Sequence, residues 1–210
     1  GSDARDRDRS IAVHAAYAVD AGLAVVTLPI AVDEGREPAS YPDLSGMFPV
    51  AARMQRALFD LLGVRAEGAT DQRPWLRHNA WPADTFPLRR DFDSSQRFSN
   101  EQEVYPFVRV EGDGVHEIPV GPIHAGIIEP GHFRFSIVGE KVLRLEQRLG
   151  YVHKGIDKRF EHFTLAEGGR LAGRVSGDST VAFAWAYAQA VESATGVTPP
   201  DRAAWLRALL

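Results

Sequence analysis

Cysteine is absent from all 210 residues of the sequence. Its absence excludes disulfide bonds, thiolate nucleophiles and cysteine-ligated zinc or iron–sulfur clusters within this chain. An excess of positive charge is also missing, because 24 lysines and arginines stand against 28 aspartates and glutamates, a formal net charge of −4. A dedicated nucleic-acid binder needs a basic stripe, so nucleic acid is not an expected partner.

Long hydrophobic runs and nucleotide-binding loops are missing as well. The longest apolar run without a charged residue lies between Asp178 and Glu192, well short of the ~20 residues of a membrane-spanning helix. No glycine-rich loop of Walker or Rossmann type is present, so we expect no nucleotide or NADH site in this chain. A composition of 44% hydrophobic and 25% charged residues is nevertheless typical of a folded globular protein.

The first half of the chain combines strand and helix patterns. Residues 11–19 and 23–32 read as strands on either side of Asp20-Ala21-Gly22, which predicts a hairpin. Apolar residues recur at helical spacing over 50–62, which predicts a helix that ends at Gly63. We expect little regular structure over residues 67–100, where four aromatic residues flank arginines and either pack locally or bind an acidic partner. These four are Trp75, Trp81, Phe86 and Phe92.

The second half predicts strands followed by helices. Strand patterns cover residues 104–110 and 115–120, and a hairpin is expected over 132–149 with its turn at Gly139-Glu140. A short helix face follows over 152–163, and a helix over 171–194 is apolar on nearly all sides, which predicts burial. Thr198-Pro-Pro-Asp201 predicts the N-cap of a last helix that continues to Leu210. The fold class expected from these patterns is α+β.

The first half contains three distinctive motifs: Tyr41-Pro-Asp-Leu-Ser-Gly-Met-Phe-Pro49, the helical set Arg56, Asp60 and Gly63, and the closing Pro87-Leu-Arg-Arg-Asp-Phe92. Together they resemble the C subunit of respiratory complex I. The resemblance implies an α/β domain of this type over residues 1–92, shortened at its start, and a linker over 93–103. The charged surface of the helix is altered, because Gln55 and Ala57 stand where the family has glutamates.

The second half contains four further motifs: Gly121-Pro-Ile-His124, Glu129-Pro-Gly-His-Phe-Arg-Phe135, the segment 149–158, and Gly173-Arg-Val-Ser-Gly-Asp-Ser179. Together they resemble the start of a catalytic large subunit, in the family shared by the D subunit of complex I and membrane-bound nickel–iron hydrogenases. The resemblance implies that residues 104–210 form the N-terminal portion of such a large subunit, cut at its C-terminal end. Both halves together resemble the large subunit of formate hydrogenlyase-type complexes.

The resemblance also places serines where hydrogenases have metal ligands. Ser176 and Ser179 occupy the positions of two cysteines of the nickel–iron site. A serine hydroxyl is a hard donor that stays protonated near neutral pH, so we expect no nickel and no other metal in this chain. From the residues alone, Ser176-Gly-Asp-Ser179 equally predicts a cap for the helix that follows.

Three residues are candidates for proton transfer or for lining a cavity. By resemblance, Glu129 matches the acidic position that passes protons in hydrogenases, Asp178 shares that task, and His124 lies in a loop that lines the quinone cavity in complex I. Two carboxylates in one low-dielectric cavity raise each other's pKa, which suits a proton relay. Glu129 is alternatively an ordinary loop carboxylate. The quinone-binding tyrosine of complex I aligns with Gly177, which has no side chain.

The resemblance implies a subunit that contributes to electron and proton transfer in a complex I-like or energy-converting hydrogenase-related membrane complex. This chain then holds no cofactor, while a neighbouring subunit holds an iron–sulfur cluster and the full complex uses quinone. Expected partners are an iron–sulfur subunit and membrane-arm subunits. His153, Lys154 and Lys158 either face the iron–sulfur subunit or form a solvated helix face. We expect a cytoplasmic, membrane-peripheral location, self-association through exposed apolar helices, and no turnover by the fragment alone. The alternative is a non-catalytic scaffold or assembly subunit.

Overall fold

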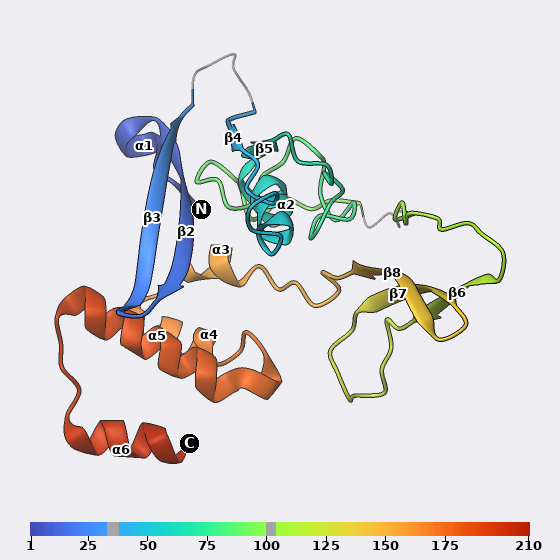
Figure 1. Cartoon of the computed structure of the whole chain (residues 1–210). Helices are drawn as coiled ribbons and strands as arrows, with labels where there is room; N and C mark the ends of the chain where they lie inside the picture. The colour runs from blue at the N-terminus through green and yellow to red at the C-terminus, as the bar shows by residue number, and fades with distance from the viewer. Residues whose placement is uncertain (33–37, 100–103) are drawn as a thin grey trace. The chain divides into compact units, whose positions relative to one another are not determined.

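The computed structural model describes residues 1–32, 38–99 and 104–210. The chain divides into two compact units, residues 1–152 and residues 153–210, which are described separately (Figure 1). Helices and antiparallel strands occur together, so the predicted α+β class is confirmed. The proposed division into 1–92 and 104–210 stays a prediction, and residues 100–103 of the predicted linker lie outside the described residues.

Among its described residues, the first unit has three small sheets and one long helix. Its elements in chain order are β1 (Ser2–Asp3), α1 (Arg5–Asp8), β2 (Ser10–Val19), β3 (Gly22–Ala31), β4 (Ser40–Pro42), α2 (Ala51–Leu62), β5 (Arg65–Glu67), β6 (Val115–Val120), β7 (His132–Val138) and β8 (Lys141–Arg148). Strands β2 and β3 form the long antiparallel hairpin in blue in Figure 1, with Val19 opposite Gly22. The hairpin predicted around Asp20 is therefore confirmed.

Helix α2 ends where the sequence predicts. Gly63 adopts a left-handed conformation with φ 73° at the helix end, and its amide donates to the Phe59 carbonyl. A Cβ atom at this position would lie 2.7 Å from the Phe86 ring, so glycine is needed for its backbone angles and for space. Just past this end Val64 is fully buried, in one apolar cluster with Ile11 and Leu62.

The third sheet has the order β6-β7-β8, with both pairs antiparallel. Strand β6 and the hairpin of β7 and β8 are confirmed, but the strand predicted over 104–110 is wrong. The backbone donors of that segment serve other partners: the Val108 amide donates to the Glu146 side chain at 2.7 Å, and the Phe107 amide donates to the Tyr105 carbonyl. The alternation of apolar residues there reflects loop packing and not a ladder.

The second unit consists of α3 (Ile156–Phe160), α4 (Leu165–Ala172), the 3₁₀ turn η1 (Gly177–Ser179), α5 (Thr180–Thr195) and α6 (Asp201–Leu209). The single helix predicted over 171–194 is wrong, because the chain leaves α4 at Gly173 and turns before α5. Val175 lies in that turn, and its carbonyl accepts a hydrogen bond from the Lys154 ammonium group at 2.9 Å. The expected burial of α5 is also wrong, since none of its residues is buried in this chain.

The ends of the helices also differ in detail from expectation. Helix α3 covers only part of the expected stretch 152–163. Helix α6 begins at Asp201 with Pro200 at its N-cap and no side-chain cap, so the cap predicted at Thr198 is wrong. Among the described residues, no helix is long and apolar enough to cross a lipid bilayer.

Candidate functional site

His124 belongs to a loop of the first unit that is closed by two histidine hydrogen bonds. Carbonyls only accept, so His124 donates from Nε2 to the Gly131 carbonyl at 2.7 Å, and His132 donates from Nδ1 to the Gly121 carbonyl at 3.1 Å. Gly121 has φ 80°, and a Cβ there would lie 2.1 Å from the Gly131 oxygen. The imidazole of His124 therefore holds the two ends of the loop together.

Glu129 lies in the same loop and is exposed. Asp178 is also exposed and lies in η1, which belongs to the second unit. The structure thus brings His124 and Glu129 into one loop and positions Asp178 in the other unit. A proton-transfer or cavity-lining role for these three residues stays a prediction.

Ser176 and Ser179 precede two helical segments, but neither side chain caps them. Ser176 is the N-cap residue of η1 and Ser179 that of α5, and no side-chain cap hydrogen bond is made at either. The hydroxyl of Thr180 instead donates to the Gly177 carbonyl at 3.1 Å. The predicted helix cap is therefore wrong at both serines.

The donor atoms around this turn do not fit a nickel–iron centre. Ser176 and Ser179, which the resemblance places at two ligand positions of hydrogenases, carry hydroxyls, whereas nickel and iron in such sites prefer thiolate. In the parts of the chain that the structure describes, no group of three or more histidines and carboxylates could hold a metal ion. Gly177, which the resemblance aligns with the quinone-binding tyrosine of complex I, has no side-chain hydrogen-bond donor for a quinone headgroup.

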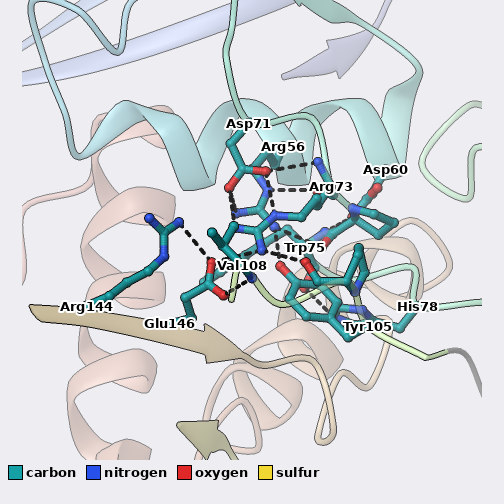
Figure 2. Close-up of polar contacts among 12 residues, drawn as sticks. Arg56, Asp60, Asp71, Arg73, Trp75, His78, Tyr105, Val108, Arg144 and Glu146 are labelled. Atoms are coloured by element: carbon teal, nitrogen blue, oxygen red, sulfur yellow. Dashed lines mark hydrogen bonds and ion pairs between the residues drawn. The ribbon is translucent and has the colours of Figure 1, made fainter. Parts of the chain in front are cut away.

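The best-defined polar cluster lies on α2, where Arg56 and Asp60 are one helical turn apart. The carboxylate of Asp60, 3% exposed as a residue, accepts the amides of Trp75 and Leu76, each at 2.7 Å. The Arg56 guanidinium donates to the Arg73 carbonyl at 2.7 Å and to the Tyr105 hydroxyl at 2.8 Å (Figure 2). These two side chains fasten the segment that follows β5 onto α2.

Arg73 extends this cluster to β8. Its guanidinium forms ion pairs with Asp71 at 2.8 Å and with Glu146 at 2.9 Å, and it donates to the Pro106 carbonyl at 3.0 Å (Figure 2). Glu146 has a 6% exposed side chain and also accepts from Arg144 at 3.1 Å. Arg73 and Glu146 therefore connect the segment that follows β5 with the sheet of β6–β8 inside the first unit.

Two carboxyl groups of this cluster titrate below their ordinary range. Burial raises the pKa of Asp71, but hydrogen bonds from Arg73 and the charges of Arg56 and Arg73 outweigh it and lower that pKa. Burial likewise raises the pKa of Glu146, whereas the Val108 amide, Arg144 and Arg73 lower it overall. Both groups are thus ionised acceptors, and the cluster is built as a structural connection more than as a proton donor.

The closing motif 87–92 also has a structural task. Arg89 is 9% exposed and donates from Nε to the Leu62 carbonyl at 2.9 Å, which satisfies the end of α2. The amide of Arg90 donates to Asp3 at 2.9 Å, and Asp3 also binds Arg5. Burial raises the pKa of Asp3, but the hydrogen bonds of Arg5 and Arg90 lower it to about 2.

Two aromatic residues of this region, Trp75 and Phe86, pack locally against arginines. Trp75 is 8% exposed, and the Arg56 guanidinium lies 5.1 Å from its ring centroid. Arg89 lies 4.3 Å from the ring centroid of Phe86. Sequence reasoning singled out Arg56 and Asp60 through their motif, but it missed Arg73, Tyr105 and Glu146. No local signal marks those three, because their partners are far away in the sequence.

The first half of the chain is similar to a known protein family. Residues 1–98 match the family model described as "Respiratory-chain NADH dehydrogenase, 30 Kd subunit". The predicted resemblance of the first half to a complex I subunit is therefore confirmed.

Relatives match along most or all of the chain. The chain is 33% identical over 216 aligned residues to formate hydrogenlyase subunit 5 of Escherichia coli. This alignment covers 100% of the chain and 38% of the Escherichia coli protein. Hydrogenase-4 component G of Escherichia coli matches with 33% identity and 38% coverage of that protein. The C/D subunit of NADH-quinone oxidoreductase from Phocaeicola vulgatus is 28% identical over 193 residues, 83% of this chain and 37% of that protein.

These matches confirm the predicted resemblance to fused C/D-type and formate hydrogenlyase-type subunits. The relatives are named as subunits or components of NADH-quinone oxidoreductase, formate hydrogenlyase and a hydrogenase. The chain spans 38% of the length of the first two of them.

Proposed function

We propose that this chain is part of a fused C/D-type subunit in an electron-transfer complex related to complex I and to energy-converting hydrogenases. The observation that carries the proposal is the order of its parts: a domain of the 30 kDa family over residues 1–98 precedes large-subunit motifs, and similarity to formate hydrogenlyase subunit 5 runs through both. The partly buried ion pair between Arg73 and Glu146 supports a chain in which the two parts act together.

In this proposal the protein couples electron arrival to proton movement. Glu129 moves the proton, and His124 and Asp178 assist or line the path. The iron–sulfur cluster belongs to a neighbouring subunit, which residues 153–158 face, and quinone is used by the full complex. Membrane-arm subunits are the other partners, and the complex lies at the cytoplasmic side of the membrane. No step passes through nickel, because Ser176 and Ser179 supply only hydroxyls.

A second candidate is a non-catalytic scaffold or assembly subunit. The specific observation that favours it is again the pair Ser176 and Ser179, since a chain without its metal ligands can retain docking surfaces. The polar cluster of Arg56, Arg73 and Glu146 is compatible with this role, because all its contacts are structural.

The substitution Glu129→Gln in the full-length protein, assembled in its complex, separates the two candidates. The matched control is Glu140→Gln, which changes another exposed carboxylate in the turn between β7 and β8. We expect Glu129→Gln to lower electron-transfer turnover by about a hundredfold or more, because a positioned acid–base group typically contributes about 10²- to 10⁴-fold to a rate. The complex should keep its composition, and Glu140→Gln should leave turnover unchanged.

Other outcomes decide against proton transfer. Unchanged turnover in the intact Glu129→Gln complex would contradict the coupling role and favour the scaffold. If no iron–sulfur partner copurifies with the wild-type protein from membranes, both candidates fail.

A further inference from the structure

The second unit contains a cavity of about 410 Å³. Its walls come from α3, α4 and the turn after α4. The lining residues are Lys154, Ile156, Arg159, Phe163, Glu167, Arg170, Leu171 and Arg174. A volume of this size lies within the range of roughly 300–1,000 Å³ found for ligand sites. We refer to it below as the basic pocket.

The charge of the basic pocket is opposite to that of the chain. Four of its eight lining residues are cations and only Glu167 is an anion, whereas the whole chain has a formal net charge of −4. Such a local excess of one sign concentrates counter-ions in a concave site.

The single carboxylate of the basic pocket is already engaged. Glu167 accepts from the Thr164 amide at 2.9 Å and from the Thr164 hydroxyl at 2.7 Å in a capping box at the start of α4. Hydrogen bonds from Thr164, together with the charge of Arg170, lower the pKa of Glu167. Within the described part of the chain, no ion pair involves Arg159 or Arg174. Their guanidinium groups therefore remain available to an external anion.

The basic pocket is held in place by a buried side chain and by a hydrogen bond to the backbone. Leu171 is 5% exposed, and Lys154 donates to the Val175 carbonyl at 2.9 Å, which fixes the turn that carries Arg174. The chain is thereby held so that cations from α3, from the last turn of α4 and from the turn after it surround one space. Holding several like charges together costs free energy, and a bound anion would relieve that cost.

We propose that the basic pocket binds an anion that carries at least two carboxylate or phosphate groups. Guanidinium groups form paired hydrogen bonds with either kind of group, and Arg159, Arg170 and Arg174 can serve more than one at once. A monovalent anion would leave most of the excess charge uncompensated. This inference goes beyond the proposed function and does not depend on it.

Binding of two probes to the 210-residue chain tests the proposal, by calorimetry at one fixed ionic strength. The probes are pyrophosphate and a hexaglutamate peptide, which represent a free polyanion and an acidic protein segment. The variants are Arg159→Gln and Arg174→Gln, and the matched control is Arg202→Gln, an exposed arginine of α6 outside the pocket. Because none of the three side chains is buried, folding should be unaffected, which circular dichroism checks.

We expect saturable binding of at least one probe, weakened about tenfold by Arg159→Gln or Arg174→Gln and unchanged by Arg202→Gln. Binding of pyrophosphate would identify a free polyanion as the ligand source, and binding of hexaglutamate alone would identify an acidic protein segment. The proposal is overturned if neither probe binds, or if Arg202→Gln weakens binding as much as the pocket variants do.

Discussion

Glu146 is the residue on which three separate segments converge. It accepts from Arg73, from Arg144 on its own strand and from the Val108 amide. The substitution Glu146→Gln keeps the shape of the side chain but removes the charge that the partly buried Arg73 guanidinium faces. We expect the free energy of unfolding of the first unit to fall by about 2 kcal/mol, measured by urea denaturation.

Glu117→Gln is the matched control for that prediction. Glu117 pairs with Arg134 at 3.1 Å, but its side chain is 42% exposed, so its loss should cost less than about 1 kcal/mol. Equal losses in the two variants would mean that the Glu146 cluster stabilises no more than a surface ion pair.

Asp3 gives the first unit a predictable response to acid. Its folded pKa of about 2 lies below the ordinary value of about 3.9 in an unfolded chain. Its contribution to stability is therefore complete above about pH 4 and is lost as the pH falls toward 2. We expect Asp3→Asn to flatten the decline of stability between pH 5 and pH 2, followed by thermal unfolding. Asp20→Asn, in the exposed hairpin turn, should leave the decline as steep as in the wild type.

At the scale of elements, the end of α2 is the most constrained point. Gly63→Ala would force a left-handed conformation on alanine and bring its Cβ against Phe86 and Arg89. We expect a loss of about 2–4 kcal/mol. Gly196→Ala is the control, because Gly196 ends α5 with φ 70° in open space and should cost only about 1 kcal/mol. Hydrogen exchange of amides in each unit measures both, and similar losses would contradict the steric part of the argument.

The elements that could be predicted are those set by local pattern. The β2–β3 hairpin and α2 follow from the strand-like residues on both sides of Asp20 and the helical spacing up to Gly63. The break after α4 could not be predicted in the same way, because apolar residues continue on both sides of Gly173 and the turn is held by the distant Lys154. The capping box was detectable, since Thr164-Leu-Ala-Glu167 has the required spacing.

The candidate site was predictable only in part. The motif containing Arg56 and Asp60 identified one face of α2, and the structure gives that face its partners. The link from Arg73 to Glu146 joins residues far apart in sequence, and one sequence carries no signal for such pairing. The glycine required at Gly121 is likewise visible only once the Gly131 carbonyl lies next to it.

At the scale of the whole molecule, the main feature is the exposed apolar surface of helices α5 and α6 in the second unit. Phe183 and Trp185 on α5 are 40% and 39% exposed, and Trp205 on α6 is 74% exposed. We expect the chain to self-associate at micromolar concentration in light scattering. Trp185→Gln and Trp205→Gln should each shift it toward the monomer, whereas Met47→Gln, at a 73% exposed residue of the first unit, should not.

Two outcomes would contradict this assembly. A monomeric wild-type chain would exclude self-association at that concentration. An oligomer that Trp205→Gln leaves intact and Val25→Lys disrupts would assign the contact to β3 instead, where Val25 is 59% exposed.

The contact between Arg73 and Glu146 also orders events during synthesis on the ribosome. At translation rates of about 5–20 residues per second, Arg73 emerges several seconds before Glu146 exists. Helix α2 and β5 can form in that interval, while the guanidinium of Arg73 is paired with Asp71 and still lacks Glu146. The ion pair between Arg73 and Glu146 can therefore form only after β8 has been synthesised.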